Sequence, residues 1–198
     1  MPTLVSGVQY SGMWTLEQAT NAKAAGTWPT QPTYLYSWGW NLVGQLGINN
    51  KISKSSPVQV GSDTTWSKLG MGLAFVLATK TSGQLWAWGE GSSGILGQNN
   101  TTNFSSPVQI GALTTWSNVA CGNYISLGFK TDGTLWSWGR NAYGALGING
   151  GGHVSSPVQV GALTNWLLAS CGQYHVASIK TDRKSTRLNS SHIPLSRM

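Results

Sequence analysis

The chain has 198 residues, enough for one or two domains with a sizeable core. Only 9% of the residues are charged, yet 12 Lys and Arg stand against 5 Asp and Glu, giving a formal net charge of +7. The 40% hydrophobic content and 11 tryptophans exclude a disordered chain. No apolar run reaches the roughly 18 residues of a membrane span, and the first residues lack the features of a signal peptide.

Residues 1–33 have a pattern of their own. Thr15 and Gln18 form a capping box, the residues between them and Gly26 are good helix formers, and Gly26 is a natural stop. We therefore expect a short N-terminal helix, followed by an extended connector that contains two prolines.

Part of this segment resembles structural proteins of tailed bacteriophages. The resemblance rests on residues 11–16 and 25–29. It implies a virion-associated role, such as a tail or fibre accessory protein. The alternative is a short adapter helix that precedes the next domain.

From residue 34 onward the chain repeats every 50 residues without an insertion. Trp38-Gly39 returns 50 and 100 residues later, and so does the Ser-Ser-Pro-Val-Gln phrase at residues 55–59. The spacing divides this region into three repeats, at about 34–82, 83–132 and 133–182.

Each repeat contains about four short segments typical of β-strands. Strands are expected at 85–88, 107–110, 116–120 and 125–131. The first has apolar residues on both faces, which predicts burial on both sides, and Pro107 is expected at a strand start. Asp132-Gly133 predicts a hairpin turn. Four short strands with apolar faces toward neighbouring units describe a propeller blade.

The repeat resembles that of the regulator of chromosome condensation (RCC1) family. The resemblance is carried by Leu-Trp-Ser-Trp-Gly-x-Asn-x-x-Gly-x-Leu-Gly at 135–147, by Pro157-Val158 and by Cys171-Gly172-x-x-His175. It implies an all-β fold of RCC1-like β-propeller blades, typically seven in a ring. Three repeats make an incomplete ring with an apolar blade face exposed at each end. We expect either a longer chain or self-association to complete it.

The third repeat breaks off at Arg183. Residues 182–192 resemble the in-frame translation of a short-read sequencing adapter, so we expect 183–198 to be a disordered tail foreign to the native gene. The alternative is a basic tail like those of nucleic-acid binders. Without residues 183–198 the net charge falls from +7 to +3. We therefore do not expect nucleic acid as a partner.

Few residues suggest chemistry. Cys121 and Cys171 share one repeat position with Met71, which predicts soft apolar core positions rather than a disulfide. His175 is expected to be a packed blade residue. No paired carboxylates, nucleophile motif or ligand spacing is present, so we expect no catalytic site, metal or cofactor.

Positions that differ between repeats are free to recognise a partner. They gather in two windows, at 40–43 and 50–54 and their equivalents, and we predict binding through Trp40, Glu90, Phe104, Arg140, Tyr143 and His153. The predicted function is that of a non-enzymatic scaffold that binds a protein or a glycan. We do not expect it to bind a membrane. The family resemblance implies one alternative, a guanine-nucleotide exchange factor or chromatin-associated regulator. A carbohydrate-active propeller is a second alternative, from a different functional class. The exchange activity of the family uses acidic residues and an inserted wedge, for which the uninterrupted period leaves no room.

Overall fold

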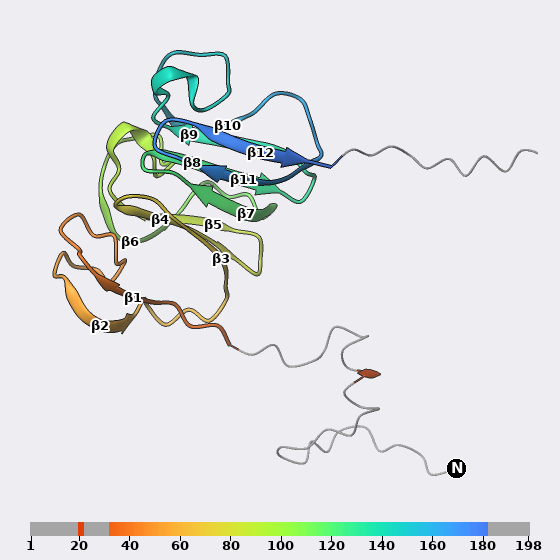
Figure 1. Cartoon of the computed structure of the whole chain (residues 1–198). Coiled ribbons are helices and arrows are strands. Elements are labelled where there is room, and N and C mark those ends of the chain that lie inside the picture. The colour runs from red at the N-terminus through yellow and green to blue at the C-terminus, as the bar shows by residue number, and fades with distance from the viewer. Residues whose placement is uncertain (1–19, 22–31, 182–198) are drawn as a thin grey trace, which may run out of the picture. The chain divides into compact units, whose positions relative to one another are not determined.

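The structure, a computed structural model, describes residues 20–21 and 32–181 (Figure 1). Thr20 and Asn21 are helical. The remainder of the expected N-terminal helix, its connector and the expected tail lie outside the described residues. The contacts divide the chain between Pro32 and Thr33, and the repeats belong to the second unit.

In the second unit, the described residues form mainly β-strands. The strands are β1 (Tyr36–Gly39), β2 (Lys54–Gln59), β3 (Trp66–Met71), β4 (Phe75–Lys80), β5 (Leu85–Gly89), β6 (Phe104–Gln109), β7 (Trp116–Cys121), β8 (Ile125–Lys130), β9 (Leu135–Gly139), β10 (Val154–Gln159), β11 (Trp166–Cys171) and β12 (Val176–Lys180). Two single-turn 3₁₀ helices, η1 (Ser92–Gly94) and η2 (Ala142–Gly144), lie in the loops. The predicted all-β class is confirmed.

The strands form antiparallel sheets that are out of phase with the sequence repeat. β3 to β6 form one four-stranded sheet and β7 to β10 another, while β1–β2 and β11–β12 are two-stranded. Each complete sheet takes its first two strands from one repeat and its last two from the next. Residues 32–181 therefore form two complete blades, preceded by the two strands β1–β2 and followed by the two strands β11–β12.

The sheets are arranged like consecutive blades of an incomplete propeller. In Figure 1 the sheet of β3 to β6 lies between β1–β2 and the sheet of β7 to β10. The first strands of successive sheets, β3, β7 and β11, contact one another in turn. The expected incomplete propeller is confirmed.

Strand β5 is buried on both faces, as its sequence predicts. Leu85 and Ala87 pack into a cluster with Trp116 and Trp138 of the next blade. Trp88, on the opposite face, packs into a second cluster with residues of the preceding half-blade. One strand thus joins two hydrophobic cores, so each blade is held by both neighbours.

The prediction for Pro107 is wrong in detail. Strand β6 begins at Phe104, so the proline lies within the strand rather than at its start. It is tolerated because β6 is the edge strand of its sheet and its register against β5 shifts between Ala87 and Gly89. An edge strand with a bulge has positions whose N–H is not needed by the ladder.

A tryptophan fastens each complete blade to the loop of the preceding one. The Trp88 indole N–H donates to the carbonyl of Gln45 at 3.0 Å, and that of Trp138 donates to the carbonyl of Ile95 at 2.9 Å. Gly47 and Gly97 have positive φ, and a Cβ on either would lie 2.7 or 2.9 Å from the indole nitrogen. The recurring glycine therefore serves this close approach. We call this arrangement the tryptophan clasp.

Lysines occupy the ring faces of other tryptophans. Lys80 Nζ lies 3.9 Å from the ring centroid of Trp86 and 5.2 Å from that of Trp66, and Lys130 repeats the arrangement in the next blade. Lys80 also forms an ion pair of 2.5 Å with Asp63. Burial raises the pKa of Asp63, but hydrogen bonds from Lys80 and Thr65 outweigh it and bring the pKa to about 2.

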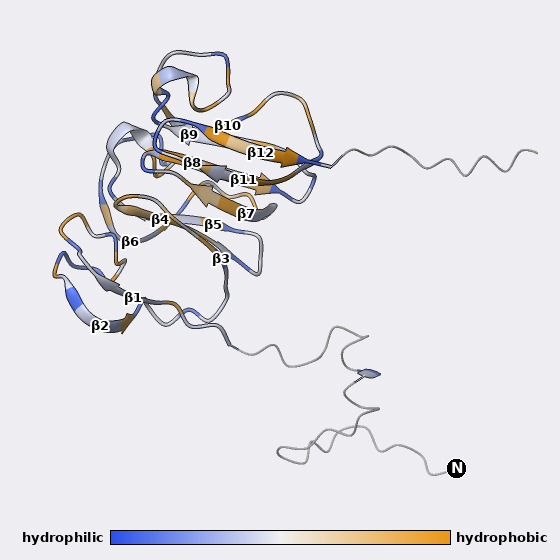
Figure 2. Ribbon diagram, viewed as in Figure 1, coloured by the Kyte–Doolittle hydropathy of each residue, from blue (hydrophilic) through white to orange (hydrophobic). Residues whose placement is uncertain are grey.

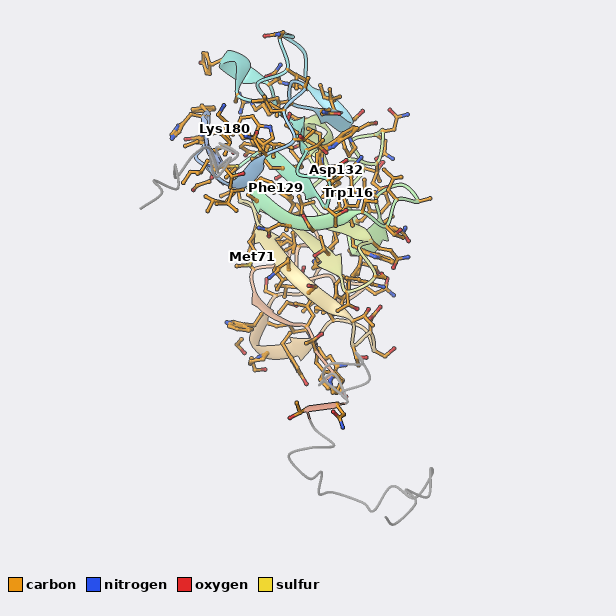
Figure 3. All side chains as sticks on the ribbon, turned by 90° about the vertical axis from the view of Figure 1, so that its right-hand side faces the viewer. Met71, Trp116, Phe129, Asp132 and Lys180 are labelled. Carbon is orange, nitrogen blue, oxygen red and sulfur yellow. The ribbon has the colours of Figure 1, made fainter. Side chains whose placement is uncertain are left out.

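Both half-blades leave apolar side chains uncovered. Trp38 of β1 is 61% exposed and Met71 of β3, labelled in Figure 3, is 76% exposed, since the described residues include no blade before them. At the other end Leu168 of β11 and Ile179 of β12 are exposed. The sequence predicted such a face at each end, and the structure confirms it.

The tryptophan clasp can be tested at Gly97. We expect Gly97→Ala to destabilise the fold by about 2–4 kcal/mol, because a Cβ would meet the Trp138 indole and the backbone is left-handed. Gly111→Ala is the matched control, since Gly111 also has positive φ but nothing within 4 Å, and should cost about 1 kcal/mol. Urea denaturation measures both. Equal losses would contradict a packing role for Gly97.

Acid should weaken the Asp63–Lys80 pair. The folded pKa of about 2 lies below the ordinary value of an aspartate, so the pair stabilises the fold above about pH 4 and this contribution is lost as the pH falls toward 2. We expect Asp63→Asn to lower the unfolding free energy by about 1 kcal/mol at pH 7, allowing for solvent screening of the partly exposed pair. At pH 2 wild type and variant should be alike. A constant difference between pH 7 and pH 2 would refute this role.

Candidate functional site

The loops of all three repeats meet on one face of the molecule. This loop face consists of the loops at 40–53, 90–103 and 140–153 and the turns at 72–74, 122–124 and 172–174, and in Figure 1 the three loops lie on the left-hand side. Backbone bonds tie loop to turn, from Glu90 N–H to the carbonyl of Ala74 and from Arg140 N–H to that of Tyr124. Figure 3 views the opposite face, with Trp116 and Asp132 labelled.

Buried asparagines organise two of the loops. The Asn41 side chain is 0% exposed, donates to the carbonyls of Asn50 and Ile52, and accepts from the Leu46 N–H at 2.9 Å. Asn141 has the same role in the third repeat. The variable window at 40–43 thus includes a position that supports the loop. In the second repeat this position is a glycine.

His153 helps to anchor its loop. Its Nδ1 accepts from the Asn141 backbone N–H at 3.2 Å. Ser53 and Asn103 make the equivalent bond in the other two repeats, to the N–H groups of Asn41 and Gly91. The three side chains differ, but each accepts the same backbone hydrogen bond. Variation at this position is therefore compatible with a structural role in the loop.

Arg140 lies at the centre of an aromatic cluster. Its guanidinium carbon is 5.6 Å from the ring centroids of both Tyr124 and Tyr174. Tyr143 makes an edge contact with Tyr174, at 5.6 Å between centroids, and is itself 90% exposed. The structure records no carboxylate paired with Arg140 among residues 32–181. Its charge is therefore available to a bound group.

The backbone presents Tyr143 in an unusual conformation. Its φ of 61° is left-handed, which is unfavourable for a tyrosine. Ser93 adopts the same conformation in the second repeat. A large exposed aromatic at a position suited to Gly or Asn favours a role in recognition over one in folding.

The other predicted residues lie apart from this cluster. Trp40 is 54% exposed and lines a groove of about 550 Å³ beside Trp38 and Met71. Glu90 is half-buried and accepts from the Ser92 hydroxyl at 2.7 Å. The structure thus brings Arg140 and Tyr143 together, and places Trp40 in a separate groove.

Phe104 does not fit the prediction of a loop contact. It is the first residue of β6, is half-buried and packs against the hydrophobic core. The strand begins three residues earlier than expected, and this draws Phe104 from the loop into the sheet. We leave it out of the candidate site.

The tyrosines at 124 and 174 escaped the sequence reasoning. Both occupy the turn after the first strand of a sheet, where the first repeat has Ala74. This turn lies outside the two variable windows, at 40–43 and 50–54 and their equivalents, from which the binding residues were predicted. The signal that could have found them is a tyrosine at a turn, where a packed core residue is not expected.

The expected core role of the cysteines is confirmed for Cys121, which packs against the core; both thiols are free. Burial raises the pKa of both, to about 11 for Cys171. His175 is exposed rather than packed, since the described residues include only two strands of its sheet, β11 and β12. Within residues 20–21 and 32–181, no cluster of His, Cys, Asp and Glu has the size of a metal site. The described residues also contain no helix long and apolar enough to cross a membrane.

Comparison with known proteins identifies the repeat. The family model described as the regulator of chromosome condensation (RCC1) repeat matches residues 34–78, 82–128 and 132–179, and a second model of this repeat matches 116–145. The ultraviolet-B receptor UVR8 of Arabidopsis thaliana is 58% identical over 26 residues, which are 13% of this chain and 6% of the receptor.

Two solved structures of the yeast protein RCC1 (Prp20) share the fold. The complex with Kap60 aligns with a TM-score of 0.66 and 18% identity, covering 76% of this chain and 39% of the yeast chain. The Saccharomyces cerevisiae protein described with its binding to Gsp1p and histones aligns with a TM-score of 0.65 and 18% identity, covering 76% and 40%. The chain thus spans less than half the length of these proteins, and the likeness shows the fold alone.

Proposed function

This chain belongs to the RCC1 repeat family, and on that premise we propose that it is a non-enzymatic scaffold that binds a partner protein through its loop face. The observation that carries the proposal is the cluster of Arg140, Tyr143 and Tyr174, in which an unpaired cation and an exposed ring stand side by side. Arg and Tyr are enriched among the residues that dominate protein interfaces.

The chemistry of this cluster favours an acidic segment of the partner. Arg140 is held between two tyrosine rings, so its guanidinium is oriented before binding. A carboxylate can pair with it through two hydrogen bonds, while Tyr143 covers an apolar side chain beside it. The Trp40 groove offers a second contact on a different repeat.

The carbohydrate-active alternative has less support. Hydrolysis of a glycosidic bond generally requires two carboxylates flanking that bond. On the described loop face Glu90 is the acidic residue, while Asp63 and Asp132 lie on the opposite face, bonded to Thr65 and Thr134. A glycan could still stack on the exposed rings, so glycans belong in the binding test.

Nucleotide exchange or chromatin association is the other alternative. The yeast relatives are described with Gsp1p, histones and Kap60 as partners, which supports protein binding as the general mode of action. A nucleotide-release assay with a Ran-like GTPase tests exchange directly. The virion-associated role and the glycan partner stay predictions, the former from a segment outside the described residues.

The scaffold function predicts that recognition can be separated from folding. We expect Trp40→Ala/Tyr143→Ala to weaken binding at least tenfold, about 1.4 kcal/mol, without lowering the melting temperature, because both side chains are mostly exposed. The probe is an acidic peptide selected against the wild type from a displayed peptide library. Its dissociation constant is then measured for wild type, variant and the control Ile52→Ala. Unchanged binding, or unfolding of the double variant, would sink the proposal.

A single substitution sharpens the same test. Tyr143→Asn suits the left-handed backbone, so we expect the unfolding free energy to stay within about 1 kcal/mol of wild type or to rise. Peptide binding should fall in the same variant. A marked loss of stability would instead make Tyr143 a structural residue through its contact with Tyr174.

A further inference from the structure

A pocket of about 370 Å³ lies between the two complete blades, and we call it the Lys130 pocket. Its lining includes Gln98, Ile110 and Leu113 from one blade and Trp116, Lys130 and Trp136 from the next. Figure 2 shows β7, which begins at Trp116, beside the sheet of β3 to β6 that it contacts. All strands of both blades are described, so both walls of the pocket are complete.

The preceding repeat holds a carboxylate at the equivalent place. Lys80 and Trp86 stand 50 residues before Lys130 and Trp136, and each lysine Nζ lies over its tryptophan ring, 3.9 and 3.6 Å from the centroid. In the first repeat the Asp63 carboxylate also pairs with Lys80 at 2.5 Å. The chain there supplies its own acidic partner for a lysine that lies on tryptophan.

A leucine replaces this aspartate in the second repeat. Leu113 stands 50 residues after Asp63, lines the Lys130 pocket and is 51% exposed. Within residues 20–21 and 32–181, Lys130 forms no ion pair. Asp132 interacts with it electrostatically, but the Asp132 Oδ1 accepts from the N–H and the hydroxyl of Thr134 at 2.9 and 2.7 Å. The ammonium group in the pocket therefore lacks a carboxylate partner.

This ammonium group has also lost part of its hydration. Lys130 is half-buried, and burial lowers its pKa, although the charge of Asp132 acts in the opposite direction. Burial has this effect because it disfavours the charged form of a side chain. A carboxylate that entered the pocket would replace the missing water with a charge-assisted hydrogen bond.

We propose that the Lys130 pocket binds a carboxylate that is attached to a compact apolar group. The carboxylate pairs with Lys130 as the Asp63 carboxylate pairs with Lys80. The apolar group packs against Ile110, Leu113 and the tryptophans of the lining. The volume is near the lower end of the usual range for ligand pockets, about 300–1,000 Å³, which suits a group no larger than a single ring.

An asparagine offers a second polar contact. Asn99 lines the pocket, and its Oδ1 accepts from the Ser156 hydroxyl at 3.4 Å. In the described part of the chain its Nδ2 has no recorded partner, so this group is available to donate to the other carboxylate oxygen. The pocket shares no lining residue with the cluster of Arg140, Tyr143 and Tyr174, and the two proposals can fail separately.

The carboxylate can belong to a free acid or to an acidic side chain, and two probes distinguish these sources. Phenylacetate represents the free acid, and the blocked tripeptide acetyl-Ala-Glu-Ala-amide represents the side chain. Each is titrated into the isotope-labelled full chain while the indole N–H signals are followed by NMR. We expect a dissociation constant of about 1 mM for the better probe. Phenylacetamide has the shape of phenylacetate without the charge and should bind at least tenfold more weakly.

Two substitutions at Leu113 test the exchange with Asp63. Leu113→Asp supplies the internal carboxylate of the first repeat, and Thr115 stands where Thr65 donates to Asp63. We therefore expect binding of the probe to fall at least tenfold. Leu113→Asn is the matched control, since it has the same shape without the charge, and it should retain most of the binding. Lys130→Met keeps the length of the side chain over Trp136 but should abolish binding.

Circular dichroism checks that each variant is folded, and if Lys130→Met is not, the Leu113 pair decides because Leu113 is exposed. Binding of either acid that follows this pattern supports the pocket, and the probe that binds more tightly identifies the source. No binding of either acid at about 50 mM, or equal binding of phenylacetamide, would overturn the proposal. Equal affinities for Leu113→Asp and Leu113→Asn would do the same, because the restored charge would then have no effect.

Discussion

The hydrogen bond from a tryptophan indole to a carbonyl of the preceding loop determines how the blades follow one another. Trp88 bonds to Gln45 and Trp138 to Ile95, and a glycine two residues after each of these carbonyls admits the ring. Because the bond joins neighbours rather than strands of one sheet, stability is shared between adjacent blades.

Much of the fold could be predicted from the sequence, because a 50-residue period with apolar strands on both faces leaves few architectures other than stacked blades. The phase of the sheets could not be predicted. A repeat defines a spacing, and any starting point describes it equally well; only the pairing of β4 with β5 across residue 83 decides where a sheet begins. Pro107 was misplaced for a related reason, since an edge strand with a bulge accepts a proline that a central strand would not.

The candidate site could be predicted only in part. Variation between repeats pointed to Arg140 and Tyr143, and in the structure both contact the ring of Tyr174. It could not separate recognition from support, because His153 differs from Ser53 and Asn103 while all three accept the same backbone bond. It also passed over Tyr174, which equals Tyr124 although its ring contacts both Arg140 and Tyr143. The role of such a side chain depends on its contacts with residues of another blade, which a comparison of repeat positions does not show.

The offset between repeat and sheet bears on how such a gene can change length. The boundary between the first two repeats falls in the turn between β4 and β5, and the next falls in the turn between β8 and β9. A crossover that deleted residues 83–132 would join Ser82 to Gly133 within a turn of unchanged length and would pair β4 with β9. The sheet formed by β3, β4, β9 and β10 would be four strands wide, like the two complete sheets it replaces. Recombination at these turns can therefore add or remove a blade and still leave the sheet at the junction with four strands.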